Sequence, residues 1–342
     1  MKDRKPTRIE AGSYYTYLSE GCRLCRRGAK LVLFVTGLCP NSCFYCPISE
    51  ERKGKDVIFA NEREVKTLED IVKEIELMSA EGASITGGEP FFTLEKTLEI
   101  ARFLKKFDLH IHVYTSLPRE DAVVKISQYV DEIRFHPVKP IKLYDKPVKT
   151  AKKLGLEVGI EIPALNFDKN IVSFVNKHDI FMNLNELEFS ATNQERLISM
   201  GFESGEFFEA KGCREIAEKY LKTVEKFHYC TVLFKDRAQM RRRLIRMAMN
   251  HPDFYLVTND GTLICGRIEC SKEEFKKLKR ILDEMDVEYK IYKISELQKV
   301  IVELSAELAE KLSEDLKAEG FSVSIVERYP TANRLVVEKV PL

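Results

Sequence analysis

The sequence predicts an α/β protein built on a partial (β/α)6 barrel, followed by a small α+β domain of ferredoxin-like type. From residue 30 onward, short β-type runs alternate with helical stretches, which is the pattern of parallel βα units. About six units can be counted, fewer than the eight of a closed barrel. After residue 253 the order changes to a hairpin followed by further helices and strands, which indicates a second domain.

The barrel elements are recognised by their length and periodicity. The predicted helix over 67–79, for example, places Leu68, Ile71, Ile75 and Met78 on one face. Predicted strands cover 31–35, 84–86, 109–114, 132–135, 158–162, 187–189 and 232–234. Predicted helices cover 67–79, 94–106, 119–129, 144–154, 168–177 and 213–227. Because helices connect the successive strands, the strands are expected to run parallel.

The second domain is marked by turn and cap signals. Asn259-Asp260-Gly261 predicts a hairpin between strands at 254–257 and 262–265. Ser271 and Glu274 form a capping box for the next helix, and Ser305 caps another that Gly320 ends. Further strands are predicted at 287–292, 299–304, 321–325 and 335–340. The predicted divisions are an N-terminal arm over 1–29, a barrel over 30–253 and a small domain over 254–342.

Composition narrows the class of protein. Hydrophobic residues make up 44% and charged residues 32%, as in soluble globular proteins. No run approaches the roughly 20 apolar residues of a membrane helix, and the N-terminus lacks the apolar core of a secretory signal. We therefore expect a cytoplasmic protein without membrane contact. A net charge of +1 provides no overall field for nucleic acid. The Lys- and Glu-rich composition without Trp is typical of thermophiles.

Nine cysteines are the most informative part of the composition, because grouped thiols in a cytosolic protein indicate metal or redox chemistry. Cys39, Cys43 and Cys46 are spaced C-x-x-x-C-x-x-C directly after the first predicted strand. Three thiolates can bind three irons of a [4Fe–4S] cluster and leave the fourth iron without a protein ligand. A structural zinc site is the alternative, but it requires a fourth ligand, and none lies nearby in the sequence.

These residues resemble the radical S-adenosylmethionine (SAM) superfamily. The triad follows the first strand, Tyr45 precedes its last cysteine, and the segment Gly87-Gly88-Glu89-Pro90 follows the second strand. The resemblance implies that the open iron binds the amino and carboxylate groups of SAM. An electron from the reduced cluster then cleaves SAM to methionine and a 5′-deoxyadenosyl radical, which abstracts hydrogen from a substrate. The sequences around the triad are most similar to archaeal proteins related to pyruvate formate-lyase activating enzyme.

The same resemblance implies where SAM is bound. Gly87 and Gly88 allow close approach of the backbone, and the Glu89 carboxylate with nearby carbonyls suits an ammonium group. Polar residues at the C-terminal ends of later strands would contact the ribose and carboxylate. Those residues are Ser116, His136, Glu161 and Ser190. Each could equally be an ordinary capping or turn residue, and Ser116-Leu117 stands where the family often has Asn-Gly.

Four further cysteines lie outside the predicted barrel. Cys22 and Cys25 precede it as C-x-x-C, and Cys265 and Cys270 follow it. Residues 260–265 resemble the beginning of the auxiliary-cluster domains found after some radical SAM barrels. If the four thiols converge, they would hold a second iron–sulfur cluster or a zinc ion. Alternatively, Cys265 and Cys270 are small buried residues and only the C-x-x-C pair has a ligand role.

A basic segment over 235–246 contains six cations and one anion. Arg241, Arg242, Arg243 and Arg246 would form an anion clamp for phosphates of RNA or a nucleotide, or for carboxylates of SAM and substrate. A solvated helix face is the alternative. Tyrosines at positions 14, 15 and 17 could stack on bases or simply pack.

Three functional hypotheses follow. The first is a radical SAM enzyme that modifies a macromolecule, with tRNA favoured and a protein substrate also possible. The second is an activating enzyme or a radical SAM enzyme for a small molecule. The third is a non-catalytic iron–sulfur or zinc protein. Both enzymatic hypotheses require a reductant protein of the ferredoxin or flavodoxin type.

Overall fold

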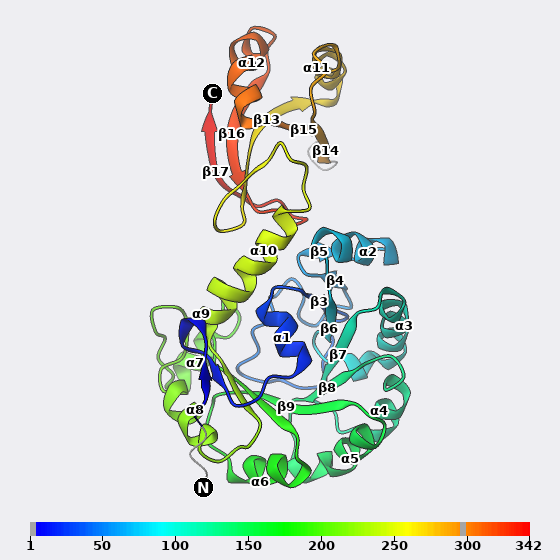
Figure 1. The fold of residues 1–342 in the computed structure, drawn as a ribbon, viewed down its shortest axis with the longest axis vertical. Coiled ribbons are helices and arrows are strands. Elements are labelled where there is room, and N and C mark those ends of the chain that lie inside the picture. The colour runs from blue at the N-terminus through cyan, green and yellow to red at the C-terminus, as the bar shows by residue number, and fades with distance from the viewer. Residues whose placement is uncertain (1–4, 295–298) are drawn as a thin grey trace. The chain divides into compact units, whose positions relative to one another are not determined.

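The computed structural model describes residues 5–294 and 299–342, and its chain forms two compact units (Figure 1). The first unit covers Met1–Arg242 and the second covers Arg243–Leu342. The sequence analysis began the small domain at residue 254, whereas the second unit begins inside the helix α10 (Arg241–Ala248). No helix in the described ranges has the length and apolar character needed to cross a membrane.

The first unit is built around a curved sheet whose parallel strands follow one another in chain order. Within the described residues these are β3 (Lys30–Phe34), β6 (Gly82–Thr86), β7 (His110–Thr115), β8 (Glu132–Phe135), β9 (Glu157–Pro163), β10 (Phe181–Asn185) and β11 (Phe227–Cys230). Short antiparallel strands extend both edges: β4 (Phe59–Ala60) and β5 (Arg63–Glu64) beside β3, and β2 (Tyr14–Tyr15) and β1 (Thr7–Arg8) beside β11. This arrangement confirms the partial barrel.

Helices connect the parallel strands and cover the outer face of the sheet (Figure 1). They are α2 (Leu68–Leu77), α3 (Leu94–Leu104), α4 (Glu120–Ile126), α5 (Asp145–Lys153), α6 (Lys169–His178), α7 (Gln194–Ser199) and α8 (Cys213–Leu221). Local signals explain their starts: Thr67 and Asp70 form a capping box for α2, and the Asp168 carboxylate accepts from the Asn170 N–H at the start of α6. Ile71 and Ile75 are buried on one face of α2, as predicted.

Two predicted strands near the end of the barrel were wrong. The strand expected at 187–189 is instead β10 at Phe181–Asn185, and the strand expected at 232–234 is β11 at Phe227–Cys230. Residues Val232–Phe234 form a helical turn, α9, and the helix expected to run to 227 ends at Leu221. Asn183 and Asn185 explain the first error, because polar residues inside a buried parallel strand break the apolar run that identifies it.

The second unit has the predicted ferredoxin-like β-α-β-β-α-β order, with one further strand before it and one after it, as also predicted. Its elements are β12 (Leu256–Val257), β13 (Leu263–Ser271), α11 (Lys272–Glu284), β14 (Lys290–Ile294), β15 (Lys299–Leu304), α12 (Ala306–Ala318), β16 (Ser322–Arg328) and β17 (Val336–Pro341). The antiparallel sheet runs β14-β15-β13-β16-β17, and β12 pairs with β13. The Ser271–Glu274 capping box is present, and the Ser305 hydroxyl caps α12.

Candidate active site

The cysteine triad lies in the loop that follows β3 and faces a cavity of about 700 Å³ at the C-terminal ends of the parallel strands. Cys39, Cys43 and Cys46 are free thiols that all line this cavity; Cys39 is exposed and the other two are half-buried. Burial raises the pKa of the Cys39 and Cys43 thiols, which favours their protonated form until a metal replaces the proton.

Two asparagines that the sequence analysis did not select hold the cysteine loop against the barrel. Asn41 donates from Nδ2 to the Ser116 hydroxyl over 2.7 Å, which links the loop to the end of β7. Asn193 is buried and donates from Nδ2 to the Tyr45 carbonyl over 3.0 Å. Asn41 lies within the cysteine motif, between Cys39 and Cys43, so its position was a signal in the sequence, whereas Asn193 belongs to no recognisable motif. Their effect is to fix the loop before any ligand is bound.

Gly87 and Gly88 bring the loop after β6 into backbone contact with the cysteine loop. Gly87 has φ of 150°, and a Cβ atom there would lie 2.4 Å from the Thr36 carbonyl oxygen. A Cβ on Gly88 would lie 2.4 Å from the Leu38 carbonyl oxygen. Both contacts are shorter than any side chain allows, so only glycine fits. The two motifs therefore touch through their main chains, and both line the same cavity.

The Glu89 carboxylate was expected to contact an ammonium group of the cofactor, but it is bonded to protein donors. Its carboxylate is buried and accepts hydrogen bonds from Phe91 N–H at 2.9 Å, Thr115 Oγ1 at 2.7 Å and Ser116 N–H at 2.7 Å, together with the Ser116 hydroxyl. Four protein donors occupy both oxygens, so the carboxylate ties the loop after β6 to the end of β7.

His136 and Tyr45, both predicted cofactor residues, form one hydrogen-bonded unit. Tyr45 Oη lies 2.8 Å from His136 Nε2, and His136 Nδ1 lies 2.9 Å from the Glu161 carbonyl oxygen. Because a carbonyl can only accept, Nδ1 carries the proton and Nε2 accepts from the tyrosine hydroxyl. Burial lowers the pKa of His136, which keeps the ring neutral at pH 7. The pair fixes Tyr45 beside Cys46.

Glu161 forms an anionic group where the cavity reaches into the barrel. Its carboxylate is bonded by Arg134 Nη1 at 2.7 Å and by Asn183 at 2.9 Å on Oε2, and by Asn185 at 2.8 Å on Oε1. Burial alone would raise the Glu161 pKa, but the charge of Arg134 and these hydrogen bonds lower it below its usual value. The carboxylate is therefore ionised at neutral pH.

Arg134 was missed by the sequence analysis, although a signal for it exists. Parallel strands covered on both faces normally read as apolar runs, and a charged residue within one stands out. Glu132 and Arg134 occupy alternate positions of β8, beside His112 and Tyr114 of β7 in register. Alternate residues of a strand face the same side, so such pairs predict a polar interior.

Ser190 is the predicted cofactor residue that does not line the cavity. Its N–H donates to Asn193 Oδ1 over 2.8 Å, and its hydroxyl lies 3.0 Å from the Thr192 hydroxyl. These hydrogen bonds are those of a turn residue, which was the alternative to a role for Ser190 in cofactor binding.

The residues around the cavity fit an iron–sulfur cluster together with SAM. Three soft thiolate donors stand on one anchored loop, which suits iron ligation. The glycine segment beside them presents main chain without side chains. Ser116, His136 and Glu161 line the remainder of the same space.

Comparisons with known proteins agree with this chemistry. Residues 33–139 match the family described as the Radical SAM superfamily. A protein of Methanocaldococcus jannaschii, whose name provisionally describes it as a glycyl-radical enzyme activating enzyme, is 38% identical over 354 residues, covering 95% of this chain and 93% of the relative. The chain belongs to the radical SAM superfamily. It is therefore an enzyme, and its cofactors are a [4Fe–4S] cluster and SAM.

Other similarities cover less or are more distant. A 5-amino-6-(D-ribitylamino)uracil–L-tyrosine 4-hydroxyphenyl transferase of Methanosphaerula palustris is 34% identical over 92 residues, 26% of this chain and 24% of that protein. Residues 261–342 match a family described as a domain of unknown function (DUF8061).

Two solved structures are similar at low identity. The radical SAM methyltransferase TsrM of Kitasatospora setae has a TM-score of 0.38 at 11% identity, over 75% of this chain and 58% of that one. SuiB of Streptococcus suis, bound to its precursor peptide, has a TM-score of 0.40 at 14% identity, over 61% and 51%. These two matches add no detail about this radical SAM enzyme.

The cysteines proposed for a second metal site do not form one set. Cys265 and Cys270 are five positions apart on β13, so they face opposite sides of the sheet. Cys265 packs in a cluster with Tyr255 and Val326, whereas Cys270 packs in a different cluster with Leu278. Burial raises the pKa of Cys265 to about 12 and of Cys270 to about 11, as for core thiols. Cys265 and Cys270 therefore do not belong to one four-thiol site. Both are small buried residues, which was the alternative interpretation.

Cys22 lies inside the first unit, on the helix α1 (Glu20–Arg26). Its Sγ accepts from Asn183 Nδ2 at 3.2 Å and from Arg134 Nη2 at 3.4 Å, and burial raises the thiol pKa to about 11. Cys25 follows one turn later and is half-buried. The Cys22 thiol thus belongs to the polar interior of the barrel, and a ligand role for this pair stays a proposal.

Helix α1 packs on the N-terminal ends of the strands. A Cβ on Gly21 would lie 2.6 to 2.7 Å from Arg134 Nη2, Glu132 Oε2 and His112 Nδ1. Ligand atoms of His110, His112 and Glu132 come within 4.8 Å of one another there. However, the Lys30 ammonium is 3.1 Å from His110 Nδ1, and Arg134 is bonded to Glu132 at 2.5 Å. Two neighbouring cations disfavour a metal dication, so these residues form a structural floor.

The four arginines of the predicted anion clamp all lie on α10, and Arg242 is the last residue of the first unit. Leu244, Met247 and Ala248 of the same helix are buried. Arg242 lines a cavity together with Arg23 and Arg26 of α1, with Arg27 directly after that helix, and with Tyr15 and Tyr17 of the arm.

Proposed function

We propose that this radical SAM enzyme is an activating enzyme, which generates a radical on a protein partner. The observation that carries the proposal is the similarity to the M. jannaschii protein, because it extends over 95% of the chain and includes the second unit as well as the barrel. A relative that matched only the cysteine motif would support the cofactor chemistry and nothing about the substrate.

Cys39, Cys43 and Cys46 would hold the cluster, and Gly87, Gly88 and the polar residues around the cavity would hold SAM. When bound, the reduced cluster and SAM supply a 5′-deoxyadenosyl radical. The chain orients these groups in advance: Glu89 joins the loops after β6 and β7, and the neutral His136 fixes Tyr45. This preorganisation places the reacting groups without further ordering of the loops.

Glu161 would contact the part of the cofactor or substrate that reaches deepest into the barrel. It is ionised and held by Arg134 and two asparagines, so it can accept hydrogen bonds from hydroxyl or ammonium groups. Cys39 is exposed at the outer side of the loop, where an electron from a docked reductant would enter. We place this reaction in the cytoplasm, with a reductant of the ferredoxin or flavodoxin type.

The test uses the anaerobically reconstituted protein with dithionite and SAM. One reaction contains a protein extract of M. jannaschii and a parallel one contains bulk tRNA from the same cells. We expect a SAM-dependent protein radical by electron paramagnetic resonance in the extract, absent with Cys43→Ala and lost on exposure to oxygen. Formation of 5′-deoxyadenosine accompanied by a new tRNA nucleoside, without a protein radical, would contradict the proposal.

A second candidate function is modification of tRNA, which the sequence analysis favoured. One specific observation supports it: four arginines and two tyrosines line a cavity remote from the cysteine triad. Such a cavity would suit phosphate groups of RNA, but it does not identify the substrate of the radical reaction.

A further inference from the structure

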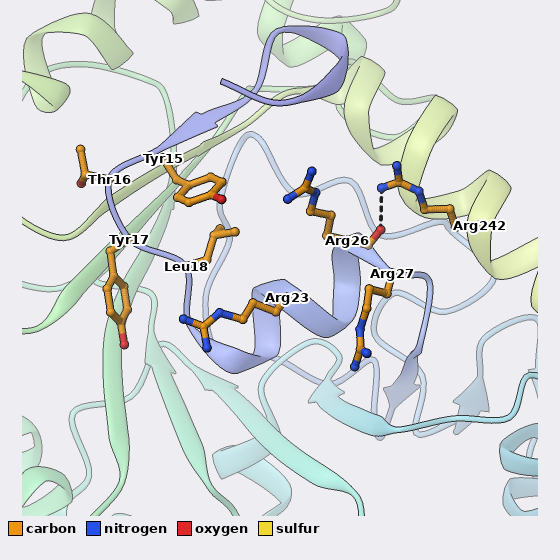
Figure 2. A pocket seen from close by; sticks show the side chains of 8 residues that line it. All are labelled: Tyr15, Thr16, Tyr17, Leu18, Arg23, Arg26, Arg27 and Arg242. Carbon is orange, nitrogen blue, oxygen red and sulfur yellow. Dashed lines mark hydrogen bonds between the residues drawn. The ribbon is translucent and has the colours of Figure 1, made fainter. Parts of the chain in front are cut away.

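A second cavity of about 700 Å³ lies in the first unit, away from the cysteine triad. It is lined by residues of the N-terminal arm, α1 and the start of α10, among them Tyr15, Tyr17, Arg23, Arg26, Arg27 and Arg242 (Figure 2). Its volume is within the range of about 300 to 1,000 Å³ of small-molecule sites. None of these residues has a role in the proposed radical reaction.

The cavity lies at the opposite end of the strands from the active site. Tyr17 donates its hydroxyl to Glu157, the first residue of β9, and its ring stacks on Phe181, the first residue of β10, with centroids 6.2 Å apart. The active-site cavity is lined by Pro163 and Asn185, the last residues of the same strands. At about 3.3 Å per residue, β9 separates the two levels by about 20 Å. A ligand here would contact neither SAM nor the cluster.

Two of the arginines share one carboxylate. Arg26 lies 3.6 Å from Glu10, and Arg242 forms an ion pair with the same glutamate. Arg242 Nη1 also donates to the Arg26 main-chain carbonyl over 2.8 Å, which fixes the Arg242 side chain beside the end of α1 (Figure 2). Two guanidinium groups around a single carboxylate leave one positive charge uncompensated. This pair is therefore suited to a second anion.

The other two arginines have individual partners that an anionic ligand can replace. Arg23 pairs with Glu20 at 3.1 Å and Arg27 pairs with Glu81 at 2.6 Å. All four side chains are more than 40% exposed, and ion pairs between exposed side chains are weak. The planar guanidinium group can donate two parallel hydrogen bonds to a phosphate. The contacts with these exposed carboxylates do not use all of its donors.

An aromatic ring completes the site. Figure 2 shows the Tyr15 ring and the Arg26 guanidinium on facing sides of the cavity. The Tyr15 ring is half-buried, and its ring plane is nearly perpendicular to that of His228, with centroids 6.5 Å apart. Bases bind to proteins by stacking on such rings, in a manner that tolerates any base.

We propose that this cavity binds the phosphate groups of a nucleotide, either free or within an RNA strand, with the base against Tyr15. The four arginines would hold the phosphates, and the arm would close one side of the site. The site is an anchoring or effector site rather than a part of the reaction centre. It stands independently of the proposed function, because its test measures binding alone.

The test measures binding to the full-length reconstituted protein by calorimetry, with ATP, inorganic pyrophosphate and a ten-nucleotide single-stranded RNA as probes. We expect ATP or the RNA to bind, with displacement by pyrophosphate but not by excess SAM. The variant Arg23→Gln/Arg26→Gln should weaken binding about tenfold or more. Binding of ATP identifies a free nucleotide as the ligand, and binding of the RNA alone identifies a strand.

The matched control is Arg102→Gln/Arg280→Gln, which removes two exposed arginines elsewhere and changes the net charge equally. It should bind the probes as the parent does. A third variant, Tyr15→Leu, should weaken ATP and leave pyrophosphate unchanged; an equal loss for both probes would refute the stacking role. The proposal is overturned if the parent binds none of the three probes, or if the control loses as much affinity as Arg23→Gln/Arg26→Gln. Unchanged thermal unfolding of each variant shows that folding is intact.

Discussion

The two ends of the barrel both carry polar side chains, but they use them differently. At the C-terminal ends of the strands, Glu89 and His136 are bonded to loops and frame a cavity of about 700 Å³. At the N-terminal ends, Glu132 and Arg134 are bonded to each other and to α1, which packs directly on them. The first arrangement orients groups around a space, and the second fills the space with ion pairs.

Mutations at the two ends of the barrel are therefore expected to have different effects. Removing a ligand at the open end should abolish the reaction and leave folding intact. Removing a charge at the floor should destabilise the fold, because a buried partner loses its counter-charge. Arg134 connects the two levels, since it bonds both Glu132 and Glu161.

The largest expected effect is at the open end. Cys43→Ala should lower iron per chain to background and abolish 5′-deoxyadenosine formation with dithionite and SAM, because two thiolates do not retain the cluster. Thermal unfolding of the metal-free protein should remain that of the parent. Iron analysis, chromatography of 5′-deoxyadenosine and thermal unfolding check these three points. The matched control is Cys213→Ala, a buried thiol outside the cavity, which should retain iron. Equal iron loss in both variants would show that the cysteine triad does not specifically bind the cluster.

At the floor, Arg134→Met should lower the free energy of unfolding by about 3–5 kcal/mol, because two buried carboxylates lose their cation. Denaturant titration of the metal-free protein measures this change. Arg102→Met, at an exposed position, should change it by no more than about 0.5 kcal/mol. A similarly small change for Arg134→Met would mean that the floor network does not stabilise the fold.

The buried polar interior of the barrel also predicts that stability depends on pH. Burial lowers the pKa of His228 to about 4, and neither ring nitrogen has a hydrogen-bond partner among the described residues. Since the unfolded histidine titrates near 6.5, the unfolded state takes up the proton first, and stability falls as the pH drops from about 6.5 to about 4. This group should contribute about 2 kcal/mol less at pH 5.0 than at pH 7.5.

Denaturant titrations at pH 5.0 and 7.5 test this contribution, with His228→Leu as the comparison. The variant should lose about 2 kcal/mol less than the parent between the two pH values. An identical pH dependence for parent and variant would show that His228 takes up a proton in the folded state as readily as in the unfolded state.

The smallest expected effect is again at the open end. Asn41→Ala removes one hydrogen bond between the cysteine loop and Ser116, so it should cost about 0.5–1.5 kcal/mol of unfolding free energy. A looser loop should also raise the KM for SAM while iron per chain stays unchanged. Steady-state formation of 5′-deoxyadenosine measures the KM. Loss of iron instead would mean that Asn41 is needed to assemble the ligand set.

Prediction from sequence succeeded where a pattern is local. The cysteine spacing, the glycine segment, the capping box at Ser271 and the hairpin at 259–261 each depend on residues close along the chain. The strand at 187–189 was misplaced because Asn183 and Asn185 point polar groups into the barrel, where tertiary partners satisfy them. The four-thiol site failed because Cys265 and Cys270 face different cores of one sheet.

The sequence by itself determined the cofactor chemistry, since three thiols on one loop and a glycine-rich segment after the next strand are short-range features. Only the tertiary structure decided what the remaining polar residues do. Glu89 was expected to contact the cofactor and joins two loops instead, and Arg134 emerged as the link between cavity and floor. Hydrogen bonds and ion pairs depend on distances of a few ångströms between residues far apart in the chain, and those distances exist only once the strands are in register.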